Sequence, residues 1–180
     1  MNFKNLSING AYIIEPNAFS DDRGVFRRAF CSDTFKNEGL SKTLAQANIS
    51  ENFKKHTLRG FHYQIEPHSE AKTLTCVSGS VYDIIVDLRP SSSTYLNWEA
   101  VNLTRENKCS LHVPKGCANS FLTLEDNTTM VYFSSNNYNP DYEKGIRYND
   151  PLFKFKWPIK KPKFISNKDS SWADFKKNNN

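Results

Sequence analysis

The chain has 180 residues, which is enough for one domain with a sizeable core and too few for two domains of ordinary size. Its 24 Lys and Arg residues exceed its 19 Asp and Glu residues by five, a modest excess that argues against a nucleic-acid-binding protein. No stretch approaches the roughly 18 apolar residues of a membrane-spanning helix, so we expect no membrane partner.

The N-terminal residues MNFKNLSING lack the basic-then-apolar pattern of a signal peptide, so we expect a cytoplasmic protein. The four cysteines, Cys31, Cys76, Cys109 and Cys117, fall at irregular spacings with no CxxC pair. In such a chain we expect reduced thiols packed as small apolar groups. Structural zinc needs ligand pairs two to four residues apart, and no two of these cysteines have that spacing.

Short runs rich in Val, Ile, Tyr and Phe alternate with turn residues along the whole chain. They cover Ala11–Glu15, Val25–Cys31, Ala45–Ser50, Thr57–Gln64, Lys72–Ser78, Val81–Leu88, Trp98–Leu103, Ser110–Val113, Asn119–Leu124 and Thr129–Ser135. This cadence is typical of an all-β sandwich or barrel. Gly79, between two runs, predicts a hairpin. Cys31–Gly39 predicts one or two helical turns, and we expect Asn178–Asn180 to be frayed.

Alternation within two runs predicts which side chains share a face. In Val81–Leu88 the apolar set Tyr82, Ile84, Val86 and Leu88 should face the core, which places Asp83 and Asp87 on the opposite face. In Thr57–Gln64, the residues Arg59, Phe61 and Tyr63 should share one face, with Leu58, Gly60, His62 and Gln64 on the other. Gly60 would then leave room beside His62.

Individual polar residues in these runs have both a catalytic and a purely structural interpretation. His62 suits a general base, but a lone histidine on a strand also fits a hydrogen-bonded structural role. A metal site would need an HxH pair or a nearby His with a carboxylate, but Gln64 stands at the third position, and His56 and His68 lie in polar loop sequence. Lys72 fits a lysine at a strand end, and Tyr132 fits a core tyrosine with a bonded hydroxyl. Asp169 fits a turn residue, while Arg23 and Arg59 fit surface ion pairs.

Longer motifs carry a resemblance to a known family. They are DDRGVFRRAF, QANIS, TLRGFHYQ, EAKTLTCVSGSVYDIIVDLRPSSSTY, HVPKGCANSF, RYNDP and ISNKD, starting at residues 21, 46, 57, 70, 112, 147 and 165. In order and over nearly the whole chain, they resemble the nucleotide-diphospho-4-keto-sugar 3,5-epimerases. The resemblance implies a single domain over residues 1–180, built as a double-stranded β-helix, or cupin-like jelly roll, with a few short helical turns.

The same resemblance implies a homodimer that needs no cofactor or metal and acts on a nucleotide-diphospho-4-keto sugar in surface-polysaccharide biosynthesis. His62 matches the family's base, Asp169 the carboxylate that holds it, Tyr132 the acid-base tyrosine and Lys72 the enolate-stabilising lysine. The residues expected to bind substrate are Arg23, Phe26, Arg28, Gln46, Asn48, Arg59, Asn119 and Tyr138, with Arg23 and Phe26 reaching the nucleotide across the dimer.

Three departures from the family pattern bear on the substrate. Asn119 replaces a histidine, Arg28 stands where many thymidylyl-specific members have Glu, and Val25 where they often have Phe. The sequence therefore leaves open a dTDP-, GDP- or CDP-linked substrate, a hexose or a heptose, and reaction at C3, C5 or both. The alternatives are a nucleotide-sugar 3,4-ketoisomerase of the same fold and a non-catalytic sugar-binding cupin.

Overall fold

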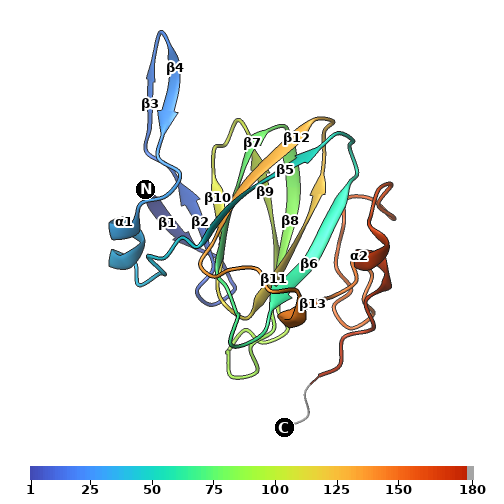
Figure 1. Ribbon diagram of the computed structural model, residues 1–180. Coiled ribbons are helices and arrows are strands. Elements are labelled where there is room, and N and C mark those ends of the chain that lie inside the picture. The colour runs from blue at the N-terminus through green and yellow to red at the C-terminus, as the bar shows by residue number, and fades with distance from the viewer. Residues whose placement is uncertain (178–180) are drawn as a thin grey trace.

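A computed structural model describes residues 1–177, in which thirteen strands form two facing sheets and a separate hairpin (Figure 1). The six-stranded sheet has the order β1 (Asn2–Asn5), β2 (Tyr12–Glu15), β10 (Ser110–Val113), β7 (Lys72–Ser78), β12 (Thr128–Ser134) and β5 (Gln46–Asn52). The five-stranded sheet has the order β13 (Glu143–Gly145), β6 (Leu58–Gln64), β11 (Cys117–Thr123), β8 (Ser80–Asp87) and β9 (Trp98–Thr104). All pairs within the two sheets are antiparallel, and the predicted jelly roll is confirmed.

Little helix accompanies the sheets. The helical elements are α1 (Ser32–Asn37), α2 (Asn167–Ser171) and the 3₁₀ turn η1 (Pro140–Tyr142). The turns predicted over Cys31–Gly39 are confirmed, and they end where Gly39 takes a φ of 73°, the left-handed conformation common after helices. Within residues 1–177, no helix is long and apolar enough to cross a membrane.

A short hairpin stands away from the body of the molecule (Figure 1). Its strands are β3 (Ala18–Asp21) and β4 (Gly24–Arg27). The predicted strand over Val25–Cys31 is therefore too long, because the chain leaves the hairpin after Arg27 and Cys31 already precedes α1. The other nine predicted runs coincide with strands to within two residues. The short strands β1, β3 and β13 were not predicted, since they are polar or exposed and carry little apolar alternation.

The chain changes sheets at Gly79, so the predicted hairpin there is wrong. β7 pairs with β10 and β12, whereas β8 pairs with β11 and β9. Gly79 has a φ of 72°, and a methyl group on it would overlap Thr128 at the start of β12. A glycine between two predicted strands is compatible with a hairpin and with a crossing between sheets. Only the strands with which β7 and β8 pair distinguish the two.

Strand β8 is buried on both faces, which corrects the predicted core face. Val81 and Ile85 pack between the two sheets with residues such as Leu74 and Leu111. The apolar set containing Ile84 packs on the other side of the five-stranded sheet, beneath an aromatic cluster from the C-terminal segment. Asp83 therefore faces the interior between the sheets.

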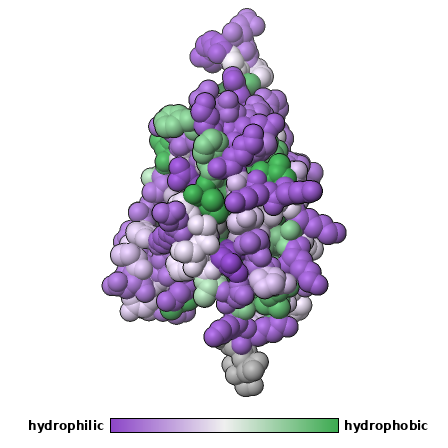
Figure 2. Space-filling view, turned by 90° about the vertical axis from the view of Figure 1, so that its right-hand side faces the viewer, coloured by the Kyte–Doolittle hydropathy of each residue, from purple (hydrophilic) through white to green (hydrophobic). Residues whose placement is uncertain are grey.

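The C-terminal segment covers the outer face of the five-stranded sheet. Phe155 stacks on Phe61 with ring centroids 4.3 Å apart, and Phe153 stacks on Phe155 at 5.0 Å. The outward surface of the side that carries this segment is mostly hydrophilic (Figure 2). The expected fraying of Asn178–Asn180 lies outside the described residues, and the single domain over 1–180 stays a prediction.

Candidate active site

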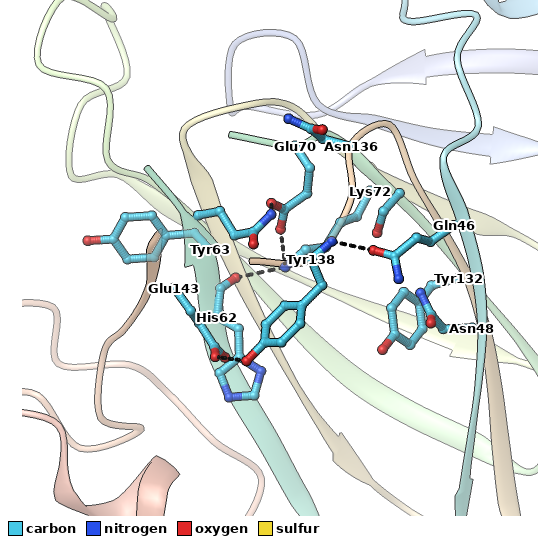
Figure 3. Close-up of a pocket in the computed structure, with 12 residues that line it drawn as sticks. Gln46, Asn48, His62, Tyr63, Glu70, Lys72, Tyr132, Asn136, Tyr138 and Glu143 are labelled. Carbon is cyan, nitrogen blue, oxygen red and sulfur yellow. Dashed lines mark hydrogen bonds and ion pairs between the residues drawn. The ribbon is translucent and has the colours of Figure 1, made fainter. Parts of the chain in front are cut away.

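A cavity of about 350 Å³ opens between the two sheets (Figure 3). Its lining comprises Gln46, Asn48, His62, Tyr63, Gln64, Glu70, Lys72, Tyr132, Ser134, Asn136, Tyr138 and Glu143. An adjoining hollow of about 300 Å³ shares His62, Lys72 and Tyr132 with it and adds Arg59 and Asn119. The structure thus brings three of the four predicted catalytic residues, from β6, β7 and β12, to one space.

A β-bulge in β6 places Arg59 and His62 on the same side. His62 pairs with Asn119 of β11, but the next partner, Ser120, pairs with Gly60, so Phe61 is unpaired. The extra residue reverses the alternation. The predicted grouping of Arg59 with Phe61 is therefore wrong, because Arg59 lines the hollow while Phe61 is buried under the C-terminal segment.

Gly60 serves the approach of a neighbouring strand and does not leave the space expected beside His62. It has a φ of 113°, and a Cβ atom there would lie 2.6 Å from the Asn119 carbonyl oxygen. Its backbone N–H donates to Oδ2 of Asp169 over 3.1 Å. The glycine allows β6 and β11 to come close while its amide holds the Asp169 carboxylate.

His62 and Asp169 form a dyad. The His62 Nε2 atom lies 2.7 Å from Oδ1 of Asp169, whose side chain is only 6% exposed. Ser166 caps α2 by accepting the Asp169 N–H, which fixes the start of this helix. Burial acts to raise the pKa of Asp169, but the hydrogen bond and charge of His62, with the Gly60 amide, outweigh it and hold the pKa below its usual value.

This contact determines the roles of the two ring nitrogens of His62. An ionised carboxylate can only accept hydrogen bonds, so Nε2 carries a hydrogen and donates a hydrogen bond to Asp169. In the neutral ring Nδ1 is then the basic nitrogen, and it makes no hydrogen bond to residues 1–177. A side chain about one-third exposed in the cavity wall can therefore accept a proton from a molecule bound there.

Lys72 and Tyr132 present positive charge and a neutral phenol to the same space. The Lys72 Nζ atom donates to the His62 carbonyl oxygen over 3.0 Å and lies 3.2 Å from Oε1 of Glu70. Burial raises the pKa of Tyr132, partly opposed by the positive charge of Arg59, so its hydroxyl stays protonated near neutral pH. Tyr132 lies on the six-stranded sheet and His62 on the five-stranded sheet. A ring-shaped molecule bound between the sheets would therefore have His62 on one side and Tyr132 on the other.

Asn119 sits above a buried acid. Its Nδ2 atom lies 3.2 and 3.3 Å from the two carboxyl oxygens of Asp83, which is fully buried. Burial raises the pKa of Asp83 to about 8, although the Asn119 hydrogen bond and the charge of Lys72 act to lower it. The position where the sequence departs from the family pattern is thus tied to an acid that is largely protonated at neutral pH.

The sequence profile described as dTDP-4-dehydrorhamnose 3,5-epimerase matches residues 5–177. The chain belongs to this family. The dTDP-4-dehydrorhamnose 3,5-epimerase of Shigella flexneri is 38% identical over 176 residues, which span 97% of this chain and 96% of that protein. The predicted membership, and with it the interpretation as a sugar epimerase of the isomerase class, is confirmed.

Two solved structures of the family resemble the fold closely. The enzyme from Bacillus anthracis, with TDP and pyrophosphate bound, superposes with a TM-score of 0.92 at 32% identity and covers 97% of this chain and 99% of its own. A dTDP-6-deoxy-D-glucose-3,5-epimerase from Legionella pneumophila, in complex with dTDP-4-keto-L-rhamnose, superposes with a TM-score of 0.88 at 34% identity, covering 93% and 89%.

The remaining predicted residues divide into two groups. Gln46, Asn48 and Tyr138 line the cavity, and the Gln46 side chain accepts the Tyr138 backbone N–H. The Arg59 Nε atom donates to Asn52 over 2.7 Å. Arg23 and Phe26 lie on the β3–β4 hairpin and Arg28 follows it, so in this chain none of the three lines the cavity.

The prediction from sequence missed several polar residues that line this cavity. Glu143 lines the cavity, accepts a hydrogen bond from the Tyr138 hydroxyl over 2.6 Å and forms an ion pair with Lys168 of α2. Glu70 bridges Lys72 and Gln64. For Glu70 a signal existed, because it stands two residues before Lys72 in the run EAK. Within residues 1–177, no group of three or more His, Cys, Asp or Glu side chains is placed to hold a metal ion.

Proposed function

We propose that this protein epimerises C3 and C5 of a dTDP-linked 4-keto-6-deoxy sugar through enolate intermediates. The observation that carries the proposal is the His62–Asp169 dyad, which shares one cavity with Lys72 and Tyr132. The names and bound molecules of the family relatives support the substrate class.

In the proposed first step Nδ1 of His62 removes a proton from a carbon next to the ketone. The 4-keto group makes the C–H bonds at C3 and C5 acidic, because the charge left behind is delocalised onto oxygen. A neutral imidazole can accept such a proton as a general base. Asp169 holds the ring in the required tautomer and stabilises the imidazolium that forms.

Lys72 would stabilise the enolate oxygen. The enolate concentrates negative charge on O4, and a preorganised cation in a partly enclosed cavity stabilises that charge more than water does. The Lys72 side chain is only 14% exposed and borders both the main cavity and the adjoining hollow. In this scheme the chain's own residues supply the required charge.

Tyr132 would supply the proton that completes each inversion. Inversion requires the new proton to arrive on the face opposite the one from which His62 took the first. The Tyr132 phenol is protonated near neutral pH and projects from the opposite sheet. Before the second carbon reacts, protonated His62 would release its proton to solvent and the Tyr132 phenolate would regain one, after which the same two transfers invert that carbon.

We propose that Gln46, Asn48, Arg59, Asn119 and Tyr138 bind the sugar and diphosphate, because all five line the joined cavities. Arg23, Phe26 and Arg28 would bind the nucleotide of a neighbouring subunit. The hairpin exposes Phe19, Val25 and Phe26 by 70%, 50% and 71%, which is unusual for apolar side chains without a partner. A homodimer that covers the hairpin accounts for this exposure. Cytoplasmic location and a role in surface-polysaccharide synthesis stay predictions of the sequence.

The experiment that tests this function incubates the protein with 4-keto sugars linked to dTDP, CDP or GDP in heavy water. NMR then reports deuterium uptake at C3 and C5 separately, and the coupling constants report inversion. We expect uptake and inversion at both carbons of the dTDP-linked sugar. Absence of exchange with every substrate would contradict the proposed function, and conversion to a 3-keto product would indicate the ketoisomerase.

A further inference from the structure

We propose that Glu70, a residue outside the predicted site, is a positioning residue that aims the Lys72 ammonium at the substrate oxygen. This inference rests on the proposed function, because it concerns the same oxyanion. Glu70 is 8% exposed and lies at the end of the connection that precedes β7. Its carboxylate borders the cavity beside Lys72, as Figure 3 shows.

Two of the three hydrogen-bond donors of Lys72 already face protein acceptors. An ammonium group has three N–H donors. One donates to the His62 carbonyl oxygen over 3.0 Å, and a second faces Oε1 of Glu70 at 3.2 Å. The ammonium therefore has one N–H group left. Because Lys72 lines the cavity, a substrate oxygen bound there can accept that hydrogen bond.

Glu70 is itself held in place by hydrogen bonds. Its other oxygen, Oε2, accepts a hydrogen bond from Nε2 of Gln64. That amide group also donates to the His68 carbonyl oxygen over 2.9 Å, and Gln64 Oε1 accepts the Asn139 backbone N–H over 2.6 Å. Glu70 is therefore anchored to the backbone of two loops, and it gives a flexible four-carbon side chain a fixed reference point.

Glu70 is expected to act through the position it gives Lys72 and not through its charge. A carboxylate beside Lys72 opposes an incoming enolate by Coulomb repulsion, so its charge by itself does not favour the reaction. Its benefit is geometric, because fixing two N–H groups prevents the ammonium from rotating away. Glu70→Gln removes the charge and keeps one acceptor oxygen, which suffices for Lys72 but not for Gln64 as well, whereas Glu70→Ala removes the charge and both acceptors. The two variants thus distinguish positioning from electrostatics.

The kinetic test compares kcat, KM and deuterium exchange for the two variants with those of the wild-type enzyme. We expect Glu70→Ala to lower kcat by about 10- to 100-fold, the loss typical of a misplaced catalytic group, with KM little changed. Exchange and inversion should fall together, since both require the enolate. Glu70→Gln should lose clearly less activity than Glu70→Ala, because it still offers Lys72 an acceptor. Glu66, exposed in the same connection, provides the matched control through Glu66→Ala and Glu66→Gln.

A second measurement needs no substrate and therefore separates failure of this inference from failure of the proposed function. In protein with ¹⁵N-labelled lysine, the Lys72 Nζ resonance, identified by its loss in Lys72→Met, reports how well the ammonium is ordered. We expect a slowly exchanging signal in the wild type and in Glu70→Gln, and its loss in folded Glu70→Ala. Full activity and an unchanged signal in Glu70→Ala would overturn the inference. Equal slowing of the Gln and Ala variants would also overturn it, because charge would then be what Glu70 supplies.

Discussion

The two residues proposed as proton carriers lie on opposite sheets of the candidate site. His62 lies on β6 with its Nε2 atom engaged by Asp169, and Tyr132 lies on β12 with a phenol that burial keeps protonated. In the proposed mechanism His62 is the base and Tyr132 is the acid. Their different roles make the division of labour between them testable.

His62→Asn should abolish deuterium uptake at both carbons, because no enolate forms without the base. A general base contributes about 10²–10⁴ in rate, so the loss should be of that size. In Tyr132→Phe exchange should persist while inversion falls, since His62 can return the proton to the face it came from. Asp169→Asn should lie between these two. Proton exchange measured by NMR beside product stereochemistry checks all three variants.

Circular dichroism of each variant controls for unfolding. If folded Tyr132→Phe stops exchange as completely as His62→Asn, the assignment of the two roles is wrong, and Tyr132 takes part in the first proton abstraction.

Asp83 is the buried acid beneath Asn119, and it makes stability depend on pH. Its pKa is raised to about 8 in the folded protein, while an unfolded Asp titrates near 3.9, a reference value. Between these values the folded state holds a proton that the unfolded state has lost, so the free energy of unfolding contributed by Asp83 falls as pH rises.

Asp83→Asn keeps the shape and removes this titration. We expect the stability of the variant relative to the wild type to increase between pH 4 and pH 8, by an amount on the order of a few kcal/mol. Urea unfolding at several pH values measures it. Asp22→Asn, at an exposed position in the hairpin turn, is the control and should follow the wild type. Parallel curves for Asp83→Asn and the wild type would show that the pKa of Asp83 is not raised.

At the scale of elements, the crossing between sheets depends on one glycine. Gly79 joins β7 of one sheet to β8 of the other within a single residue, with a φ of 72° and Thr128 against it. A side chain there meets both an unfavourable backbone conformation and a steric overlap, so the crossing requires glycine.

Gly79→Ala should lower the free energy of unfolding by about 2–4 kcal/mol, the sum of left-handed backbone strain and overpacking. Gly39→Ala separates the two effects, because Gly39 has a φ of 73° but no atom within 4 Å of the added methyl group. That variant should lose only about 1–2 kcal/mol. Chemical denaturation of both checks the difference, and equal losses would mean that the Thr128 contact costs nothing.

At the scale of the whole molecule, the β3–β4 hairpin projects beyond the compact body, with its aromatic residues exposed (Figure 1). The double variant Phe19→Ser/Phe26→Ser should weaken the proposed dimer, since it removes apolar area that a partner would bury. Light scattering should give about twice 20.7 kDa for the wild type and a lower mass for the variant at micromolar concentration. A wild-type mass near 20.7 kDa would contradict the dimer.

The sequence alone predicted the strand runs, the all-β class and, through the resemblance, the family. Strand runs are readable because apolar and β-branched residues gather in them, and motifs such as TLRGFHYQ keep their order whatever the three-dimensional path. The four residues proposed for catalysis were likewise named from the sequence, and the structure gathers His62, Lys72 and Tyr132 round a single cavity and joins Asp169 to His62.

Only the tertiary structure decided the pairings and the faces. The bulge at Phe61 reverses the alternation in β6, and Gly79 carries the chain across to the other sheet, because both depend on which distant strand lies alongside. Asp83 lies between the two sheets, and the alternation within β8 did not reveal this. The C-terminal segment buries the apolar set on the outer face, so apolar character did not mark the face that points between the sheets. Glu70 and Glu143 became visible as parts of the site for the same reason, since the environment of a carboxylate is set by neighbours far away in the sequence, and local patterns do not encode those neighbours.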